Sequence, residues 1–185
     1  LVNWADAIGA VTLESILGSS RAFDEIVFTV YKHSGAKKSA GNVRRMLADS
    51  ILVNQNEKVH DPYSIRCIPQ VHGAIRDNLE FIGRILNEHI NSITDDPIFF
   101  SAEEVRKNPP FDSIRERLHF EEGHFHGEPM AFAMDWLGIV MAELGSISER
   151  RIQMLLDPNH NQGLPAFLVE NSKGLNTGYM LAQYT

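Results

Sequence analysis

Two long segments with helical periodicity constrain the fold of this chain most. Apolar residues recur every three or four positions from Pro69 to Thr94. A second long helix is predicted from Glu128 to Leu156, because Pro129 suits a first helical turn and Asp157-Pro158 suits a helix end. The middle of this helix, Trp136 to Ala142, has no polar face, which is typical of a helix buried on all sides. We therefore predict an all-α, long-helix bundle that is larger than this chain can complete alone.

The rest of the chain offers shorter elements. Periodicity predicts helices from about Val2 to Leu17 and from Asn42 to Asn54, with a loop through residues 32–35 between them. Residues 23–30 fit a short helix or an extended segment equally well. Another helix-like run begins near Leu175 and continues to Thr185. Neither end of the sequence resembles a natural domain boundary.

Composition narrows the class of protein. The chain has 185 residues, 43% of them apolar, which is enough to bury a core. The net charge of -7, with no run of basic residues, argues against binding to nucleic acid. The sequence contains no stretch of about 18 uncharged apolar residues, so we predict no membrane span. The single cysteine, Cys67, excludes an internal disulfide framework and fits a reducing compartment, so we expect a cytoplasmic protein.

The most unusual polar stretch is residues 60–73, where Tyr63 and Arg66 lie between Pro62 and Pro69. Each proline fixes its own φ and restricts the residue before it, so we expect a stiff, non-helical segment. An arginine held in this way can bind a carboxylate, and the tyrosine hydroxyl can donate, accept or transfer a proton. The alternative is an ordinary connector with Arg66 in solvent and Tyr63 packed.

A second polar cluster, residues 121–129, precedes the buried helix. His124 and His126 are two positions apart and Glu128 follows, so the three could bind a metal if the backbone is extended. No further ligand has convincing spacing, and histidines at a helix start are commonly structural. We therefore predict no metal site and keep metal binding as an alternative.

Both polar stretches resemble motifs of the histidine and aromatic amino-acid ammonia-lyases. Residues 60–73 match the family's tyrosine–arginine motif, and residues 123–129 match its Gly-Asn-Phe-His-Gly-Glu-Pro motif, with His124 in place of the asparagine. Further matches occur in the same order as in the family. They lie at residues 13–18 together with 23–24, at 33–35, at 91–97 and at 174–183. The resemblance thus covers nearly the whole chain.

The resemblance implies an all-helical homotetramer that eliminates ammonia from L-histidine or an aromatic amino acid, giving an unsaturated acid such as urocanate. By the same resemblance Tyr63 and Arg66 are catalytic residues, and Arg66 binds the substrate carboxylate while Tyr63 assists proton transfer or positioning. Phe125 lines the substrate site. His60 stands there in place of the usual glutamine, which puts a titratable ring into the site. The family's electrophile is 4-methylideneimidazol-5-one, formed from an internal Ala-Ser-Gly.

Departures from the family matter equally. No Ala-Ser-Gly occurs in the sequence, and His33-Ser34-Gly35 belongs to a different loop that should not cyclise. The resemblance places the electrophile upstream of Leu1, and a glutamate of histidine-specific members beyond Thr185. We therefore expect residues 1–185 to be a partial lyase domain with an exposed insertion at about 99–122. Such a fragment would be inactive alone and would need a homo-oligomer or a complementing lyase chain.

Three questions stay open at this point. The alternative function is a noncatalytic helical association module descended from a lyase. In that case His60 and His124 would be replacements that followed the loss of catalytic activity. The residues do not decide between histidine, phenylalanine and tyrosine as the substrate. They also do not decide between elimination and amino-group migration.

Overall fold

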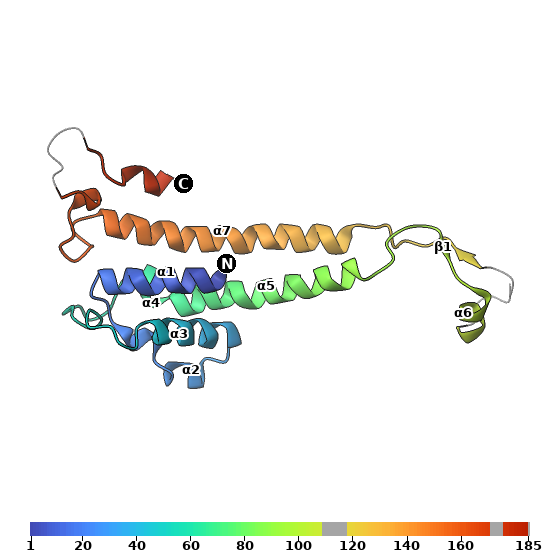
Figure 1. Cartoon of the computed structure of the whole chain (residues 1–185), viewed down its shortest axis with the longest axis horizontal. Coiled ribbons are helices and arrows are strands. Elements are labelled where there is room, and N and C mark those ends of the chain that lie inside the picture. The colour runs from blue at the N-terminus through green and yellow to red at the C-terminus, as the bar shows by residue number, and fades with distance from the viewer. Residues whose placement is uncertain (109–117, 171–175, 185) are drawn as a thin grey trace. The chain divides into compact units, whose positions relative to one another are not determined.

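The structure, a computed structural model, describes residues 1–108, 118–170 and 176–184, and helices make up nearly all of its regular structure (Figure 1). The chain divides into two compact units, of which the first contains residues 1–80 and 138–185 and the second residues 81–137. The two longest helices, α5 (Ile68–Ile90) and α7 (Glu128–Leu156), each contribute to both units. The prediction of an all-α, long-helix protein is confirmed.

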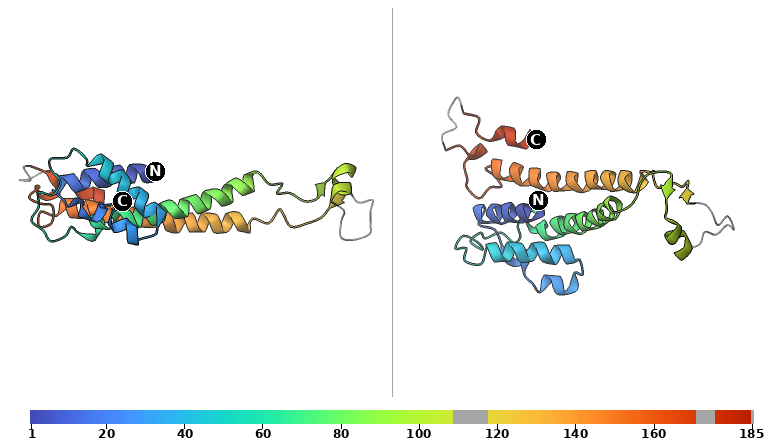
Figure 2. Two further views of the ribbon diagram at one scale, coloured as in Figure 1. Left: turned by 90° about the horizontal axis from the view of Figure 1, so that it is seen from below. Right: turned by 45° about the vertical axis from the view of Figure 1, so that its right-hand side comes forward.

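In the first unit, α1 (Val2–Ser15) packs against α3 (Ser34–Met46), and Figure 2 shows the two helices from two further sides. The unit also contains α2 (Val27–Val30), α4 (Tyr63–Arg66) and three 3-10 helices, η1 (Ser20–Phe23), η2 (Ala166–Leu168) and η3 (Met180–Tyr184). The core combines side chains from α1, α3, α4, α5 and α7. Its buried members are Ala10, Leu13, Ile16, Phe23, Val43, Leu47, Val53, Ile65, Ile68, Ile147 and Met154.

Some predicted helix bounds agree with the structure and others do not. Helix α7 begins and ends at the predicted residues, while α5 ends at Ile90, before the predicted end at Thr94. The helix predicted at residues 42–54 is wrong, because α3 spans Ser34–Met46. Residues 32–35 were predicted as a loop, yet α3 begins at Ser34, and Gly35 and Ala36 are buried. Of the helix-like run predicted from Leu175 to Thr185, the two end residues lie outside the described residues, and η3 forms within the remainder.

The segment between Pro62 and Pro69 is helical, so the prediction of a non-helical segment is wrong. Tyr63–Arg66 form the single turn α4, with Pro62 as its N-terminal flanking residue, and α5 begins at Ile68. Pro69 falls in the first turn of α5, where a missing N–H breaks no intrahelical hydrogen bond. Two prolines therefore accommodate helix starts at this site.

Helices α3 and α5 approach so closely that only glycine fits at their contact. A Cβ atom at Gly73 would lie 2.2 Å from the backbone nitrogen of Ala36, and one at Gly35 would lie 2.2 Å from the carbonyl oxygen of Gly73. Beside this contact Ser34 Oγ donates a hydrogen bond to Asp77 Oδ1 at 3.1 Å. The glycine pair thus sets the distance between the two helices.

The second unit contains the remaining parts of α5 and α7 and the chain between them. Strands β1 (Ile98–Phe99) and β2 (His119–Phe120) pair antiparallel, and α6 (Ala102–Lys107) follows β1. Ser101 and Glu104 form a capping box at the start of α6, and no residue of α6 is buried. Of the insertion expected at about 99–122, residues 109–117 lie outside the described residues.

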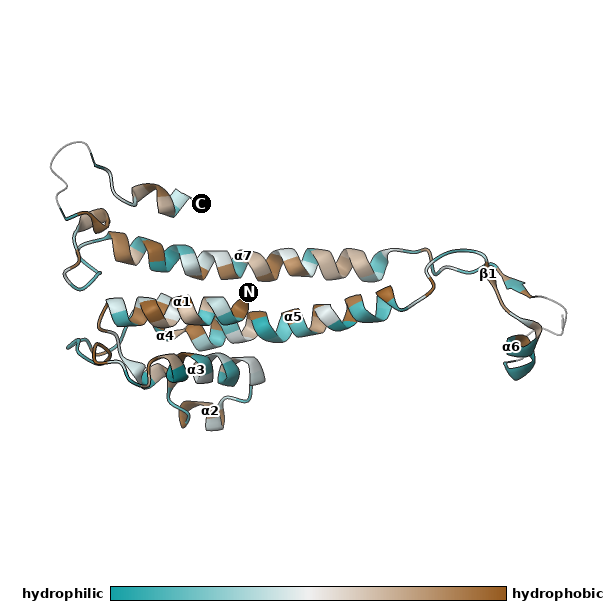
Figure 3. Ribbon diagram, in the orientation of Figure 1, coloured by the Kyte–Doolittle hydropathy of each residue, from teal (hydrophilic) through white to brown (hydrophobic). Residues whose placement is uncertain are grey.

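Helix α7 has exposed apolar side chains in each unit. Trp136, in the second unit, is 44% exposed and Ile139, in the first unit, is 61% exposed, so the predicted burial on all sides is not found in the described residues. Figure 3 shows apolar residues distributed along the helix. Among the described helices, α7 is long and apolar enough to cross a membrane. This is weak support for a membrane span, because the core helices of soluble proteins share both properties.

Candidate functional site

The turn that carries Tyr63 and Arg66 is held from two sides. Asp61, which is buried, accepts hydrogen bonds from the backbone N–H of Ser19 at 2.6 Å and from Asn56 Nδ2 at 3.1 Å. On the core side Ile65 is fully buried. These contacts fix the turn that the sequence singled out as a candidate site.

Tyr63 and Arg66 lie together on this turn. The guanidinium carbon of Arg66 is 4.6 Å from the centre of the Tyr63 ring, which is within the range of a cation–π interaction. Tyr63 is 72% exposed and Arg66 is half-buried, the reverse of the ordinary connector considered as an alternative. Within the part of the chain that the structure describes, no carboxylate forms a salt bridge with Arg66. The guanidinium is therefore available to an anionic ligand.

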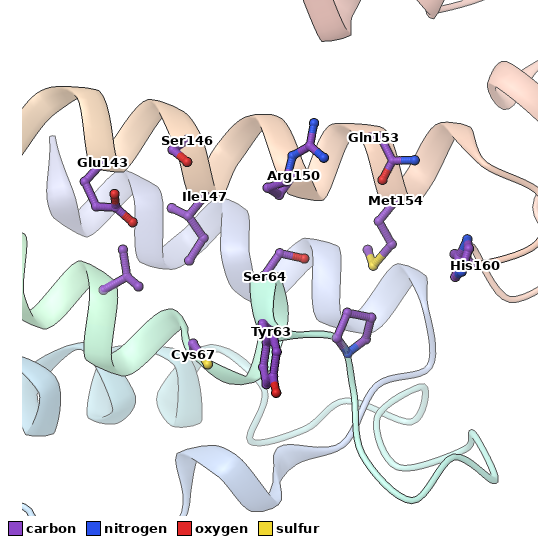
Figure 4. Close-up of a pocket in the computed structure, with 12 residues that line it drawn as sticks. Tyr63, Ser64, Cys67, Glu143, Ser146, Ile147, Arg150, Gln153, Met154 and His160 are labelled. Carbon is purple, nitrogen blue, oxygen red and sulfur yellow. The ribbon is translucent and has the colours of Figure 1, made fainter.

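A cavity of about 460 Å³ adjoins the turn within the first unit (Figure 4). Its walls come from α4, the start of α5 and the second half of α7, and Tyr63 directs its hydroxyl away from the α7 side chains. The lining residues are Pro62, Tyr63, Ser64, Cys67, Val71, Glu143, Ser146, Ile147, Arg150, Gln153, Met154 and His160. This volume is in the range of small-molecule sites, roughly 300–1,000 Å³.

Arg150 and His160, which line this cavity, already have carboxylate partners. Arg150 Nη2 donates to Glu149 Oε1 at 2.6 Å, and this hydrogen bonding raises the pKa of Arg150 and lowers the pKa of Glu149. The backbone N–H of Asn159 and then His160 lower the pKa of Asp157, which lies 2.6 Å from His160 Nδ1. Arg66 thus differs from Arg150 in having no carboxylate partner among the described residues.

The other two predicted site residues lie elsewhere. His60 is exposed in the loop before Asp61, in the same unit as Tyr63. Phe125 belongs to the second unit, is 60% exposed and stacks on His126 with ring centres 6.1 Å apart. The structure therefore brings Tyr63 and Arg66 together and describes Phe125 as part of a separate unit.

The histidine cluster does not form a metal site in the described residues. His124 Nδ1 lies 3.1 Å from Glu122 Oε2, while His126 pairs with Glu128. Each histidine thus has its own glutamate partner. No group of three or more His, Cys, Asp or Glu side chains that could hold a metal ion occurs in residues 1–108, 118–170 and 176–184.

Sequence reasoning missed a buried polar network in the first unit. Asp6 is fully buried and accepts hydrogen bonds from Asn42 Nδ2 at 2.6 Å and from Arg76 Nη2 at 2.7 Å. His72 Nδ1 lies 2.9 Å from the same carboxylate, and Arg151 Nη1 lies 3.2 Å from His72 Nε2. A signal was present, because His72 follows Ile68 by four positions and precedes Ile75 by three, which places it on the apolar face of α5.

The pKa shifts of this network show both the cost and the compensation of burial. Burial acts to raise the pKa of Asp6, but hydrogen bonds from His72 and Asn42 and the charge of Arg76 lower it below the ordinary value of 3.8. Burial lowers the pKa of Arg151 from 12.5 to about 10, against the opposing effect of the Asp6 charge. For Asp6 the favourable partners thus outweigh the cost of burying its charge, whereas for Arg151 the cost of burial is larger than the effect of its partner.

The comparison with protein families assigns this helical chain to a class. The family model described as aromatic amino acid lyase matches residues 1–185. The chain therefore belongs to the aromatic amino acid lyase family.

Individual relatives agree with this assignment. The chain is 43% identical over 187 residues to a histidine ammonia-lyase of Natranaerobius thermophilus and 46% identical over 187 residues to one of Caldanaerobacter subterraneus subsp. tengcongensis. In both cases the alignment covers 100% of this chain and 34% of the relative. This chain thus spans about a third of the length of these relatives.

Solved structures show the same fold. The histidine ammonia-lyase from Trypanosoma cruzi is similar with a TM-score of 0.80 at 35% identity, covering 99% of this chain and 31% of that chain. A tyrosine aminomutase from Streptomyces globisporus is similar with a TM-score of 0.83 at 30% identity, covering 99% and 36%. The fold therefore occurs in proteins named for elimination and for amino-group migration.

Proposed function

We propose that this chain forms part of an ammonia-lyase that eliminates ammonia from L-histidine or an aromatic amino acid. The observation that carries the proposal is the Tyr63–Arg66 pair, which combines an open guanidinium with an exposed phenol on a fixed turn. The names of the relatives, most of them histidine ammonia-lyases, favour L-histidine as the substrate and urocanate as the product. The family resemblance of residues 60–73 supports catalytic roles for Tyr63 and Arg66.

Each residue of the pair has a distinct task in this proposal. Arg66 binds the substrate α-carboxylate through charge-assisted hydrogen bonds from its guanidinium N–H groups. The Tyr63 ring holds the guanidinium in place, while its hydroxyl, which points away from α7, positions or transfers a proton. From the family resemblance alone we also propose that Phe125 and His60 contribute to the substrate site of the assembled enzyme.

The family's 4-methylideneimidazol-5-one does not fit the residues of this chain. It forms from Ala-Ser-Gly, which the sequence lacks. The nearest approach, His33-Ser34-Gly35, lies at the start of α3, where Ser34 bonds Asp77 and Gly35 contacts Gly73. A backbone constrained in this way has no freedom to cyclise. We therefore propose that the chain is inactive alone, whether as a monomer or as a homo-oligomer of residues 1–185, and that a complementing lyase chain contains the electrophile.

Exposed apolar surface supports such a partner. Trp4, Ile8 and Val11 form an exposed stripe along α1, at a spacing that puts them on one face of the helix. An unpartnered apolar stripe of this kind is typical of an interface with another chain. We propose that this partner is a protein of the same family. We also propose a cytoplasmic location, because the single thiol, Cys67, fits a reducing compartment.

Complementation tests the proposal directly. The chain is mixed with a histidine ammonia-lyase that retains its Ala-Ser-Gly but has its own tyrosine and arginine of the matching motif replaced. We expect absorbance of urocanate to grow with L-histidine in the mixture and not with either component alone. The control mixture contains the Arg66→Ala variant and should stay inactive. Absence of product from L-histidine, L-phenylalanine and L-tyrosine in a mixture that demonstrably associates would refute the proposed function.

A noncatalytic association module is the alternative, and the same α1 stripe favours it. In that case the chain would join lyase oligomers without restoring turnover. The complementation mixture separates the two functions, because association is measured by sedimentation and turnover by absorbance.

A further inference from the structure

The buried polar network joins four helices of the first unit: three contribute side chains at the Asp6 carboxylate, and the fourth is joined through His72. Asp6 comes from α1, Asn42 from α3, His72 and Arg76 from α5, and Arg151 from α7. Asp6 and His72 are fully buried, and Arg151 is 3% exposed. Arg151 Nη2 also donates to Ser148 Oγ at 3.1 Å. Asp6, His72 and Arg151 therefore lie inside the core, while Arg76 reaches the network from a partly exposed position.

The partners of His72 specify one arrangement of its ring. A carboxylate accepts hydrogen bonds only, so the proton of His72 must be on Nδ1, which faces Asp6. A guanidinium donates only, so Nε2 must accept the hydrogen bond from Arg151. Rotation of α5 about its axis, or a shift along it, would break both contacts at once. Apolar neighbours such as Ile65 and Ile68 impose no comparable direction.

Stability alone does not account for Arg151. Its charge is held where burial lowers its pKa to about 10, so the core disfavours the charged form. Removing a buried charge in favour of an apolar side chain of similar volume is often neutral or stabilising. The best-attested role of a buried ionic group that does not add stability is to fix the register of one helix against another.

The part of the chain whose register is fixed leads directly into the Tyr63–Arg66 turn. The N–H of Cys67 bonds the carbonyl oxygen of Tyr63 at 2.9 Å, and the N–H of Val71 bonds that of Cys67 at 3.0 Å. These bonds continue the helical pattern from α4 to α5 and join the turn to His72. The rotation of α5 therefore sets the direction in which Arg66 and Tyr63 point.

We propose that the Asp6–His72–Arg151 network is a positioning element that sets the rotation and register of α5 against α1 and α7 and thereby orients Tyr63 and Arg66. The residues of the network act through the turn and do not touch substrate. The consequence for substrate binding rests on the proposed lyase function, whereas the positioning of the turn does not.

The chain contains its own reporter for this positioning. Cys67 is the only cysteine, is half-buried and lies between Arg66 and the first residue of α5. The experiment measures the rate at which an aromatic disulfide reagent modifies Cys67 under native conditions, together with the urea midpoint of the same protein. The variant is Arg151→Met, which removes the charge and retains an apolar side chain. The control is Arg106→Met, at an exposed position of α6.

We expect Arg151→Met to keep the urea midpoint of the wild-type chain and to raise the modification rate of Cys67 by about tenfold, because the turn samples more orientations. Arg106→Met should change neither quantity. An unchanged Cys67 rate in Arg151→Met would overturn the proposal. A lower urea midpoint, or failure to fold, would also overturn it, because the network would then be a stability device.

A second measurement separates this proposal from the proposed function. In an active mixture with a complementing lyase, Arg151→Met should raise KM for the amino acid more than it lowers kcat. Equal KM values for the variant and the wild type would contradict the positioning of Arg66. If the thiol result holds and every mixture is inactive, the lyase function fails and the positioning stands.

Discussion

The contact between α3 and α5 allows a prediction whose size follows from the coordinates. Replacing Gly73 by alanine places a Cβ atom 2.2 Å from the backbone nitrogen of Ala36 and 2.7 Å from the carbonyl carbon of Gly35. Ordinary contacts require about 3.5 Å, so the two helices must separate by ~1 Å. Both obstructing groups are backbone atoms, and a side-chain rotation cannot relieve the overlap.

The expected cost is at the upper end of overpacking. A separation of this size forfeits a quarter to a half of the dispersion energy across the contact, and overpacked cores typically lose about 1–3 kcal/mol. Alanine regains up to about 1 kcal/mol of helix propensity over glycine. We therefore expect Gly73→Ala to lower the free energy of unfolding by about 2 kcal/mol. For a chain of this size that corresponds to a fall in Tm of about 4–8 °C.

Thermal unfolding followed by circular dichroism measures the effect. The matched control is Gly145→Ala in α7, in the same unit, where a Cβ atom meets nothing within 4 Å. The control should gain up to about 1 kcal/mol from helix propensity alone. The two variants are thus expected to shift Tm in opposite directions. Equal or parallel shifts would refute the reasoning that the α3–α5 distance is set by glycine.

Three further predictions concern the site, the network and the core. In an active complementation mixture, Arg66→Ala should raise KM by at least about tenfold, and Arg66→Lys should restore only part of the loss, because a single ammonium cannot replace the planar fork of donors; unchanged steady-state kinetics in Arg66→Ala would remove the assignment. Because the pKa of Asp6 is lowered in the folded state, its stabilising contribution is present above pH 3.8 and is lost as the pH falls below that value. Urea midpoints measured down to acidic pH should therefore fall less steeply for Asp6→Asn than for the wild type, and parallel profiles would contradict the assigned direction. Leu13→Ala empties a fully buried core position and should cost about 2–5 kcal/mol in urea unfolding, whereas Ile8→Ala on the exposed face of the same helix should cost less; similar costs would mean that α1 packs on its other face.

Local signals accounted for the elements that the sequence predicted well. Helix α7 has its predicted bounds because Pro129 and Asp157-Pro158 act through their own backbones, whatever packs around them. Tyr63 and Arg66 were named as candidates from the proline-bounded motif, whereas their contact follows from the helical turn α4, which the sequence did not predict. The same reasoning treated the two prolines as barriers to a helix and missed that both stand at helix starts.

The sequence by itself determined the all-α class and the two long helices, and its motifs supplied the candidate site residues as a prediction, since helical period and motif order are properties of neighbouring positions. Tertiary structure alone decided the start of α3 and the polar network. Ser34 and Gly35 look like a loop until Gly73 lies against them, and Asp6 becomes a compensated carboxylate only when His72 and Arg76 surround it. Both outcomes depend on which helix faces meet, and that choice is made by burial between residues far apart in the chain.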